Sequence, residues 1–150
     1  MVKGRSDVHI LQRDCNEVLI QEVFPKVRYE NYRRGLCLLD PYGLHLEWRV
    51  IEAAGKSRAI DLFFNFPIMD ANRNALWRNP EAVSSEQASR LTAFWGDDSW
   101  RSILYRPKRQ RSLFGEQTLE KVGNPEVAEA FRARLQEYAG FAHVPRPIAI

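Results

Sequence analysis

The stretch of this chain most suggestive of chemistry is an Asp-Pro-Tyr-Gly sequence that directly follows an apolar run and precedes an amphipathic segment. A carboxylate at the end of a buried strand is costly unless it is hydrogen-bonded or used in function. Residue type and spacing leave two interpretations open, a cap for the following turn or helix and a functional carboxylate. The candidate residues are Asp40, Pro41, Tyr42 and Gly43.

Two more polar clusters follow predicted strands, so the expected sheet carries polar residues at the end of every strand. Asp14 and Asn16 come after the apolar residues 8–11, and Asn65 lies near the end of the apolar residues 59–66. In open α/β sheets, ligands bind beyond the carboxyl ends of the strands. We therefore expect a ligand site at this edge, with a simple helix cap as the alternative role of Asp14.

The elements that would position these residues alternate between strand and helix in the first half of the chain. The predicted order is strand, helix, strand, helix and strand, over residues 8–11, 16–23, 36–39, 46–54 and 59–66. Parallel strands need helical crossovers, so the sequence predicts an α/β fold with a parallel sheet of about three strands. Residues 36–39 are continuously apolar, which is typical of a strand covered on both faces. Gly55 stands where a C-terminal cap of the second helix is expected.

The second half of the chain has helical patterns, which predict a helical extension over about residues 84–140. Ser84 and Gln87 form a capping box at the start of its first helix. Asn124 is the expected cap of its last helix, with Pro125 at the first helical position. The predicted helices cover, in order, residues 84–95, 98–104, 112–122 and 124–138.

Composition places the chain among ordinary globular domains, since 45% of its 150 residues are hydrophobic and 27% are charged. Lys and Arg number 22 against 19 for Asp and Glu, a mild excess that suits an anionic partner without requiring one. There is no apolar run of membrane-spanning length and no signal-peptide pattern, so we expect a cytoplasmic protein with no membrane partner. Cys15 and Cys37 are far apart and no histidine has metal-ligand spacing, which predicts reduced thiols and no metal site.

Two stretches carry residues that suit nucleic acid. In the first, residues 69–80, Arg73 would meet a phosphate and Asn72 or Asn74 would read a base edge. The alternative for that stretch is a capped loop that packs Trp77 onto the sheet. In the second, residues 100–114, cations are interleaved with aromatic residues, which suits the binding of single-stranded nucleic acid. A solvated loop whose aromatic residues belong to the core is an equally good interpretation. The candidate binding residues of the second stretch are Arg106, Lys108 and Arg109.

Four longer stretches carry a family resemblance. They are "RDCNEVL" (13–19), "LCLLDPYGLHLEW" (36–48), "DLFFNFPIMDANRNALWRNP" (61–80) and "FWGDDSWR" (94–101). Together they resemble the three-Cys-motif partner family over most of the chain. The resemblance implies a Rossmann-like class I methyltransferase fold, of which this chain would be a partial version. The segment "LLDPYG" is also similar to the fourth motif of class I methyltransferases that act on amino groups.

The resemblance implies roles for particular residues. In amino-group methyltransferases, the acidic side chain and the proline carbonyl of this motif accept hydrogen bonds from the target amine, and the aromatic residue stacks on the base. This assigns Asp40–Gly43 to the catalytic site and gives the motif a positioning role. Asp14, together with Asn16, would contact the cofactor S-adenosylmethionine. The family takes its name from cysteines in a genomic neighbour, a radical-SAM-like protein, which is therefore an expected partner.

The chain also departs from the family's pattern, because it has no glycine-rich loop through which the backbone approaches S-adenosylmethionine. We therefore expect residues 1–150 to form one incomplete methyltransferase-like domain that does not bind this cofactor alone. We expect its open sheet edge to promote self-association. Three functions stay open: a methyltransferase-like protein acting on nucleic-acid amino groups in its full-length form, a non-catalytic module that binds nucleic acid or protein, and a truncated inactive fragment.

Overall fold

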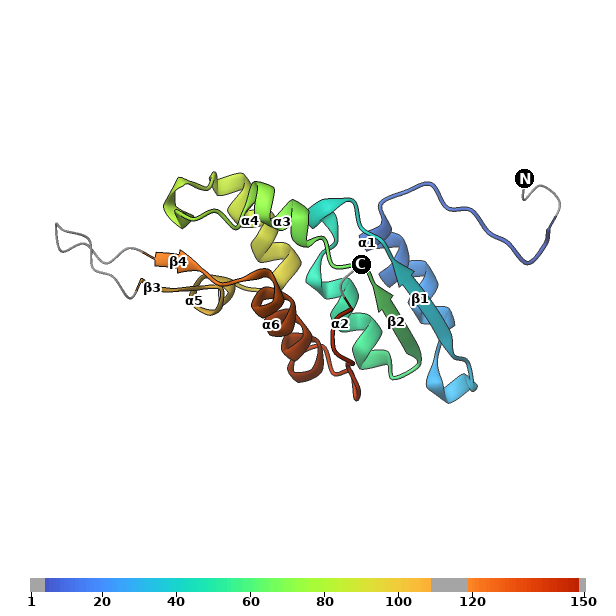
Figure 1. The fold of residues 1–150 in the computed structure, drawn as a ribbon. Helices are drawn as coiled ribbons and strands as arrows, with labels where there is room; N and C mark the ends of the chain where they lie inside the picture. Colours follow the sequence, from blue (N-terminus) through green and yellow to red (C-terminus); the bar gives the residue numbers. More distant parts are fainter. Residues whose placement is uncertain (1–4, 109–118, 149–150) are drawn as a thin grey trace.

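The computed structural model describes residues 5–108 and 119–148 of this mixed helix-and-strand protein. The α-helices are α1 (Cys15–Val18), α2 (Trp48–Ser57), α3 (Ile68–Asn74), α4 (Ser85–Trp95), α5 (Trp100–Ile103) and α6 (Asn124–Glu137). The strands are β1 (Gly35–Leu39), β2 (Ile60–Phe64), β3 (Tyr105–Pro107) and β4 (Leu119–Lys121). The β1–β2 sheet and the β3–β4 pair lie towards opposite ends of the molecule, and α2, α4 and α6 lie between them (Figure 1).

The parallel sheet has two strands within the described residues, not the three that the sequence predicts. β1 pairs with β2 in parallel, from Gly35 opposite Ile60 to Leu39 opposite Phe64, and α2 forms the crossover between them. Residues 8–11, the third expected strand, form no strand, and Ile10 is 81% exposed. That prediction is wrong, because an apolar β-branched run becomes a strand only where a neighbouring strand takes its backbone hydrogen bonds.

One face of the β1–β2 sheet is exposed. Cys37 and Phe64 point towards the core, while Leu36, Leu38 and Phe63 point away from it and are 61–70% exposed. The prediction that both faces of β1 are covered is therefore wrong for the described residues. A continuous apolar run specifies two apolar faces, but it does not specify that the chain provides an element to cover each one.

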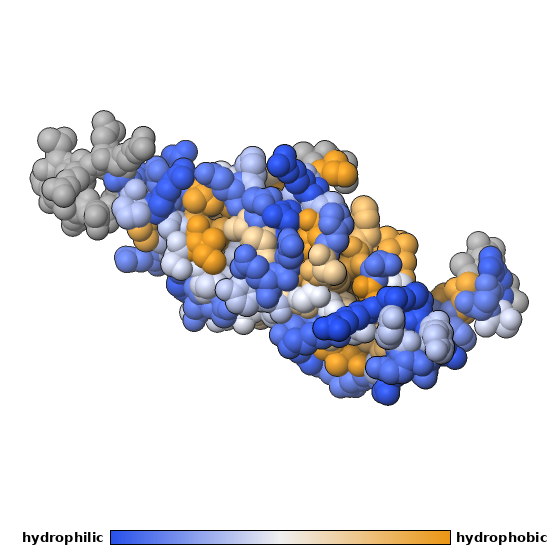
Figure 2. All heavy atoms as spheres, turned by 90° about the horizontal axis from the view of Figure 1, so that it is seen from below, coloured by the Kyte–Doolittle hydropathy of each residue, from blue (hydrophilic) through white to orange (hydrophobic). Residues whose placement is uncertain are grey.

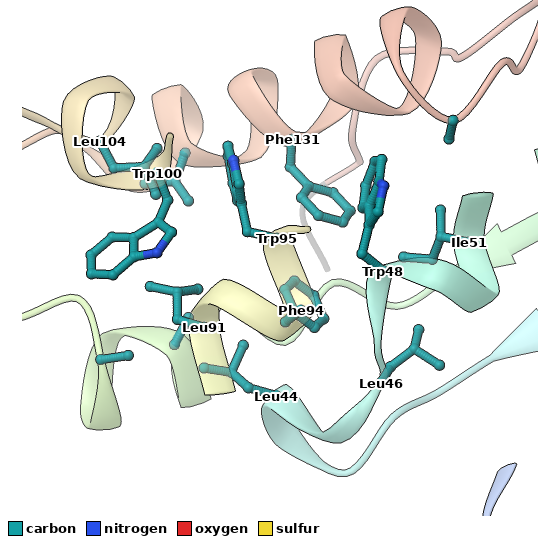
Figure 3. Close-up of a cluster of buried hydrophobic side chains, with 14 of the residues drawn as sticks. Leu44, Leu46, Trp48, Ile51, Leu91, Phe94, Trp95, Trp100, Leu104 and Phe131 are labelled. Carbon is teal, nitrogen blue, oxygen red and sulfur yellow. The ribbon is translucent and has the colours of Figure 1, made fainter. Parts of the chain in front are cut away.

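The core lies between α2, α4 and α6 and contains a cluster of packed aromatic side chains. Phe131 of α6 stands at its centre, with its ring 5.3 Å from Phe94 of α4 and 6.0 Å from Trp48 of α2. Trp95 flanks the same ring at 5.6 Å (Figure 3). Such ring pairs add about 0.5–1.5 kcal/mol each beyond the area that they bury. The cluster holds the three helices against the covered face of the sheet.

The helix boundaries bear out some sequence signals and correct others. Ser84 accepts a hydrogen bond from the Gln87 N–H and Gly96 ends α4 with a φ of +104°, as expected. Gly55 is not a cap, because α2 continues to Ser57; its lack of a side chain lets the Ala139 carbonyl approach.

The remaining predicted helices differ from the structure at their ends. Leu119–Lys121 form β4 instead of the end of a predicted helix, and the earlier part of that helix lies outside the described residues. The last helix begins one residue earlier than expected, with Gly123 at the cap position and its N–H bonded to Glu126. Across residues 5–108 and 119–148, no helix is both long and apolar enough to cross a membrane.

Candidate functional site

The ends of β1 and β2 bring two predicted site residues together. Asp40 follows the last residue of β1 and Asn65 follows the last residue of β2, and these strands end in register. The Asn65 side-chain Nδ2 donates a hydrogen bond of 2.8 Å to Oδ1 of Asp40. Both residues are exposed. The Asp40 carboxylate therefore faces solvent at the sheet edge, and among the described residues no donor bonds its other oxygen.

The capping role that the sequence left open for Asp40 belongs to Asp70 of α3. Oδ2 of Asp70 accepts a hydrogen bond of 3.2 Å from the backbone N–H of Leu44, and its Oδ1 accepts one of 2.8 Å from Asn74. Gly43 makes this approach feasible, because a Cβ at this position would lie 2.4 Å from Oδ2 of Asp70. Its φ of +61° also lies in the region that favours glycine. Asp40 is thus left without a structural task in the turn that follows it.

A polar cleft of about 310 Å³ lies beside this edge. It runs between the turn at Gly43–His45, α3 and the first half of α4, and Arg73 and Arg90 contribute positive charge to its walls. Arg90 is held by Glu86 at 2.7 Å. Tyr42 is 92% exposed, and its ring lies nearly parallel to that of His45 at 6.2 Å. The exposed Tyr42, two residues after Asp40, therefore lines a cleft whose walls carry Arg73, Arg90 and the Asp70 carboxylate.

The two residues expected to contact a cofactor are engaged in holding α1. Oδ1 of Asp14 accepts hydrogen bonds from the backbone N–H groups of Asn16 and Glu17, at 2.8 and 3.2 Å. Asn16 is 5% exposed, and its amide bonds the backbone of the turn after β1 at both ends, with His45 O at 3.1 Å and Glu47 N at 2.8 Å. Asn16 therefore holds the fold, and Asp14 uses one of its two carboxylate oxygens to cap α1.

The other predicted nucleic-acid contacts are divided between structural and exposed positions. Asn72 donates a hydrogen bond of 2.9 Å to Asn124 and also contacts Lys121, so Asn72 joins α3 to β4 and α6. Burial lowers the pKa of the Lys121 ammonium group. Arg106 lies between two carboxylates, Glu120 at 3.3 Å and Glu126 at 3.4 Å. Arg73 and Lys108 are exposed, and Arg109 lies outside the described residues.

Sequence reasoning missed His45 and Arg90 as neighbours of the Asp40 edge. His45 is placed there by the short turn after Gly43, and Arg90 comes from a helix that is more than forty positions further along the chain. A turn signal at Gly43 could have suggested His45, but no local pattern could have suggested Arg90. Comparisons with family models, with curated proteins and with solved structures gave no match to this chain.

Proposed function

We propose that this chain is a methyltransferase-like protein with part of a Rossmann-like fold, and that its Asp40 edge binds the amino group of a nucleobase. The observation that carries the proposal is the exposed Asp40–Asn65 pair at the carboxyl end of a parallel sheet, beside the exposed ring of Tyr42. The resemblance to three-Cys-motif partners favours the same residues.

The chemistry of the pair suits an amine donor. Asn65 occupies one oxygen of the Asp40 carboxylate and orients the group, so the second oxygen can accept a hydrogen bond from an exocyclic N–H. A carboxylate that accepts from the cytosine amino group is a recurring base contact. Tyr42 offers the ring on which such a base would stack, and Arg73 stands at the cleft where its phosphate would lie.

The proposal for this chain is recognition of the amino group, without methyl transfer. Asn16 is buried and used by the fold, and Oδ1 of Asp14 caps α1, so the proposal includes no methyl-transfer step. We expect calorimetric titration with S-adenosylmethionine to show no saturable binding in the micromolar range. Saturable heats would contradict this expectation and would restore the methyltransferase interpretation for the chain as it stands.

The test of amine recognition compares two RNA oligonucleotides of equal length, oligocytidylate and oligouridylate, by fluorescence anisotropy. The two bases differ at the position where cytosine carries its amino group and uracil carries a carbonyl. One hydrogen bond to a charged acceptor is worth about 1.5–3 kcal/mol, so we expect cytidine to bind about 10- to 100-fold more tightly.

Two variants assign the preference to its residue. Asp40→Ala should make the two affinities equal, while Glu137→Ala, which removes an exposed carboxylate from α6, should leave the preference intact. If cytidine and uridine bind equally to the unmodified chain, or if the preference survives Asp40→Ala, the proposal is wrong. A loss of thermal stability in Asp40→Ala, without an effect on preference, would assign Asp40 to structure.

A further inference from the structure

A basic surface lies at the end of the β1–β2 sheet opposite to Asp40. It is formed by the turn that precedes β1 and by Arg58, the residue that follows α2. We call it the basic turn patch. Its members are Lys26, Arg28, Tyr29, Tyr32, Arg33, Arg34 and Arg58. Figure 2 views the molecule from below, the side on which this turn lies in Figure 1, and shows strongly hydrophilic atoms at this end.

Hydrogen bonds and a cation–π contact hold the two parts of the patch together. The turn is closed by a hydrogen bond of 3.2 Å from the Arg33 N–H to the Arg28 carbonyl. The Arg34 guanidinium donates to the Arg58 carbonyl at 2.6 Å and lies 4.7 Å from the centre of the Tyr29 ring. The patch is therefore a defined arrangement of cations and aromatic rings, held by the protein's own carbonyl oxygens.

The positive charge of the patch is not neutralised by carboxylates. Among residues 5–108 and 119–148, no ion pair involves any of its five cations, and Glu30 is the one acid within the turn. By contrast, Arg49, Arg90 and Arg132 each pair with a glutamate. The whole chain has only a mild excess of positive charge. Cations without a carboxylate partner at one end of it therefore indicate an anionic ligand for that end.

The backbone of the patch is strained at two residues. Tyr32 and Arg58 have φ values of +54° and +52°, and they are the only non-glycine residues with positive φ in the described part of the chain. Both residues follow a helix end, Tyr32 after Tyr29–Asn31 and Arg58 after α2, a position that often takes this conformation and favours glycine. Glycine would relieve the strain at both positions. The chain instead places there an arginine and a tyrosine whose side chain is 98% exposed.

We infer that the basic turn patch binds the backbone and bases of single-stranded nucleic acid, an inference that rests on the proposed function for the class of its ligand. Cations would track the phosphates, and Tyr32 and the outer face of Tyr29 would stack on bases. This combination binds single strands with little sequence preference, because every base has a π face. The patch would hold the strand at one end of β1 while the Asp40 edge reads an amino group at the other.

The test uses an oligouridylate and the double variant Tyr32→Gly with Arg58→Gly. Both substitutions remove a ligand contact and suit the positive φ, so the fold should keep its stability. We expect the dissociation constant to rise at least about fivefold from the lost stacking alone. The slope of log affinity against log salt should also fall by about 0.7 for the lost cation. Arg146→Ala, which removes an exposed cation elsewhere, is the matched control and should leave the affinity largely intact.

Further measurements distinguish a loss of RNA binding from a loss of folding. Circular dichroism checks that the double variant is folded. Arg33→Gln, which removes a cation that donates to the Lys26 carbonyl, gives a second variant whose salt slope should also fall by about 0.7. Unchanged oligouridylate affinity in a folded variant, or an equal loss in Arg146→Ala, would overturn the inference, as would binding to phosphatidylserine vesicles without binding to RNA. Uridine lacks the amino group, so failure here leaves the cytidine preference assigned to Asp40 to be decided by its own experiment.

Discussion

Gly43→Ala is the substitution that best tests how the turn after β1 positions the candidate site. A Cβ at this position would lie 2.4 Å from Oδ2 of Asp70 and 2.8 Å from its carboxyl carbon. The carboxylate would have to move, and it would then lose its hydrogen bond to the Leu44 N–H. The loss of a bond to a charged acceptor costs about 1.5–3 kcal/mol, and the φ of +61° adds about 1 kcal/mol for alanine.

The expected total is a loss of about 2.5–4 kcal/mol in the free energy of unfolding, measured by urea denaturation. For a chain of this length, the melting temperature should fall by about 10 °C. A double-mutant cycle with Asp70→Ala separates the two contributions. In the Asp70→Ala background, Gly43→Ala should cost only about 1 kcal/mol, because the group that it displaces is no longer present. An equal cost of Gly43→Ala in both backgrounds would refute the reasoning.

Three further substitutions test other parts of the structure. Gly55→Ala would place a methyl group 2.1 Å from the Ala139 carbonyl oxygen, so urea denaturation should show a loss of at least about 2 kcal/mol in spite of better helix propensity. Burial raises the pKa of Tyr105 to about 12, so stability should fall as pH rises from 10 towards 12, where only the unfolded tyrosine ionises. Tyr105→Phe should remove that fall. At neutral pH it should also lower the free energy of unfolding, because the hydrogen bond from the Tyr105 hydroxyl to the Trp77 carbonyl is lost. Leu38→Lys, on the exposed sheet face, should reduce self-association measured by light scattering while leaving the melting temperature nearly unchanged.

The elements that were predictable from sequence are those whose signals are local. The serine cap of α4, its terminal Gly96 and the apolar stripe of α2 each act within a few residues, so pattern and structure agree. The two strands β1 and β2 were also predictable, because short apolar runs separated by a helix of crossover length favour parallel pairing.

The errors concern features that depend on distant parts of the chain. Residues 8–11 have the composition of a strand but lack a pairing partner in the described residues. Gly55 has the residue type of a cap, but the feature that requires glycine is the carbonyl of Ala139, more than eighty positions away. Asn16 looks like a ligand contact, and only its bonds to the turn at residues 45–47 reveal a structural task. Local sequence cannot report such contacts.

The strongest reason to regard the sheet edge as functional is that Asp70, and not Asp40, caps the turn after β1. A carboxylate that follows a strand commonly caps the next turn, but here Asp70 of α3 supplies the acceptor for that turn. Asp40 instead holds one contact, with Asn65, and that contact fixes its orientation at the surface. Because both residues are exposed, water competes for this bond, so it adds less to stability than a buried bond would. Its orientation beside the uncovered ring of Tyr42 is therefore better explained by a ligand than by the fold.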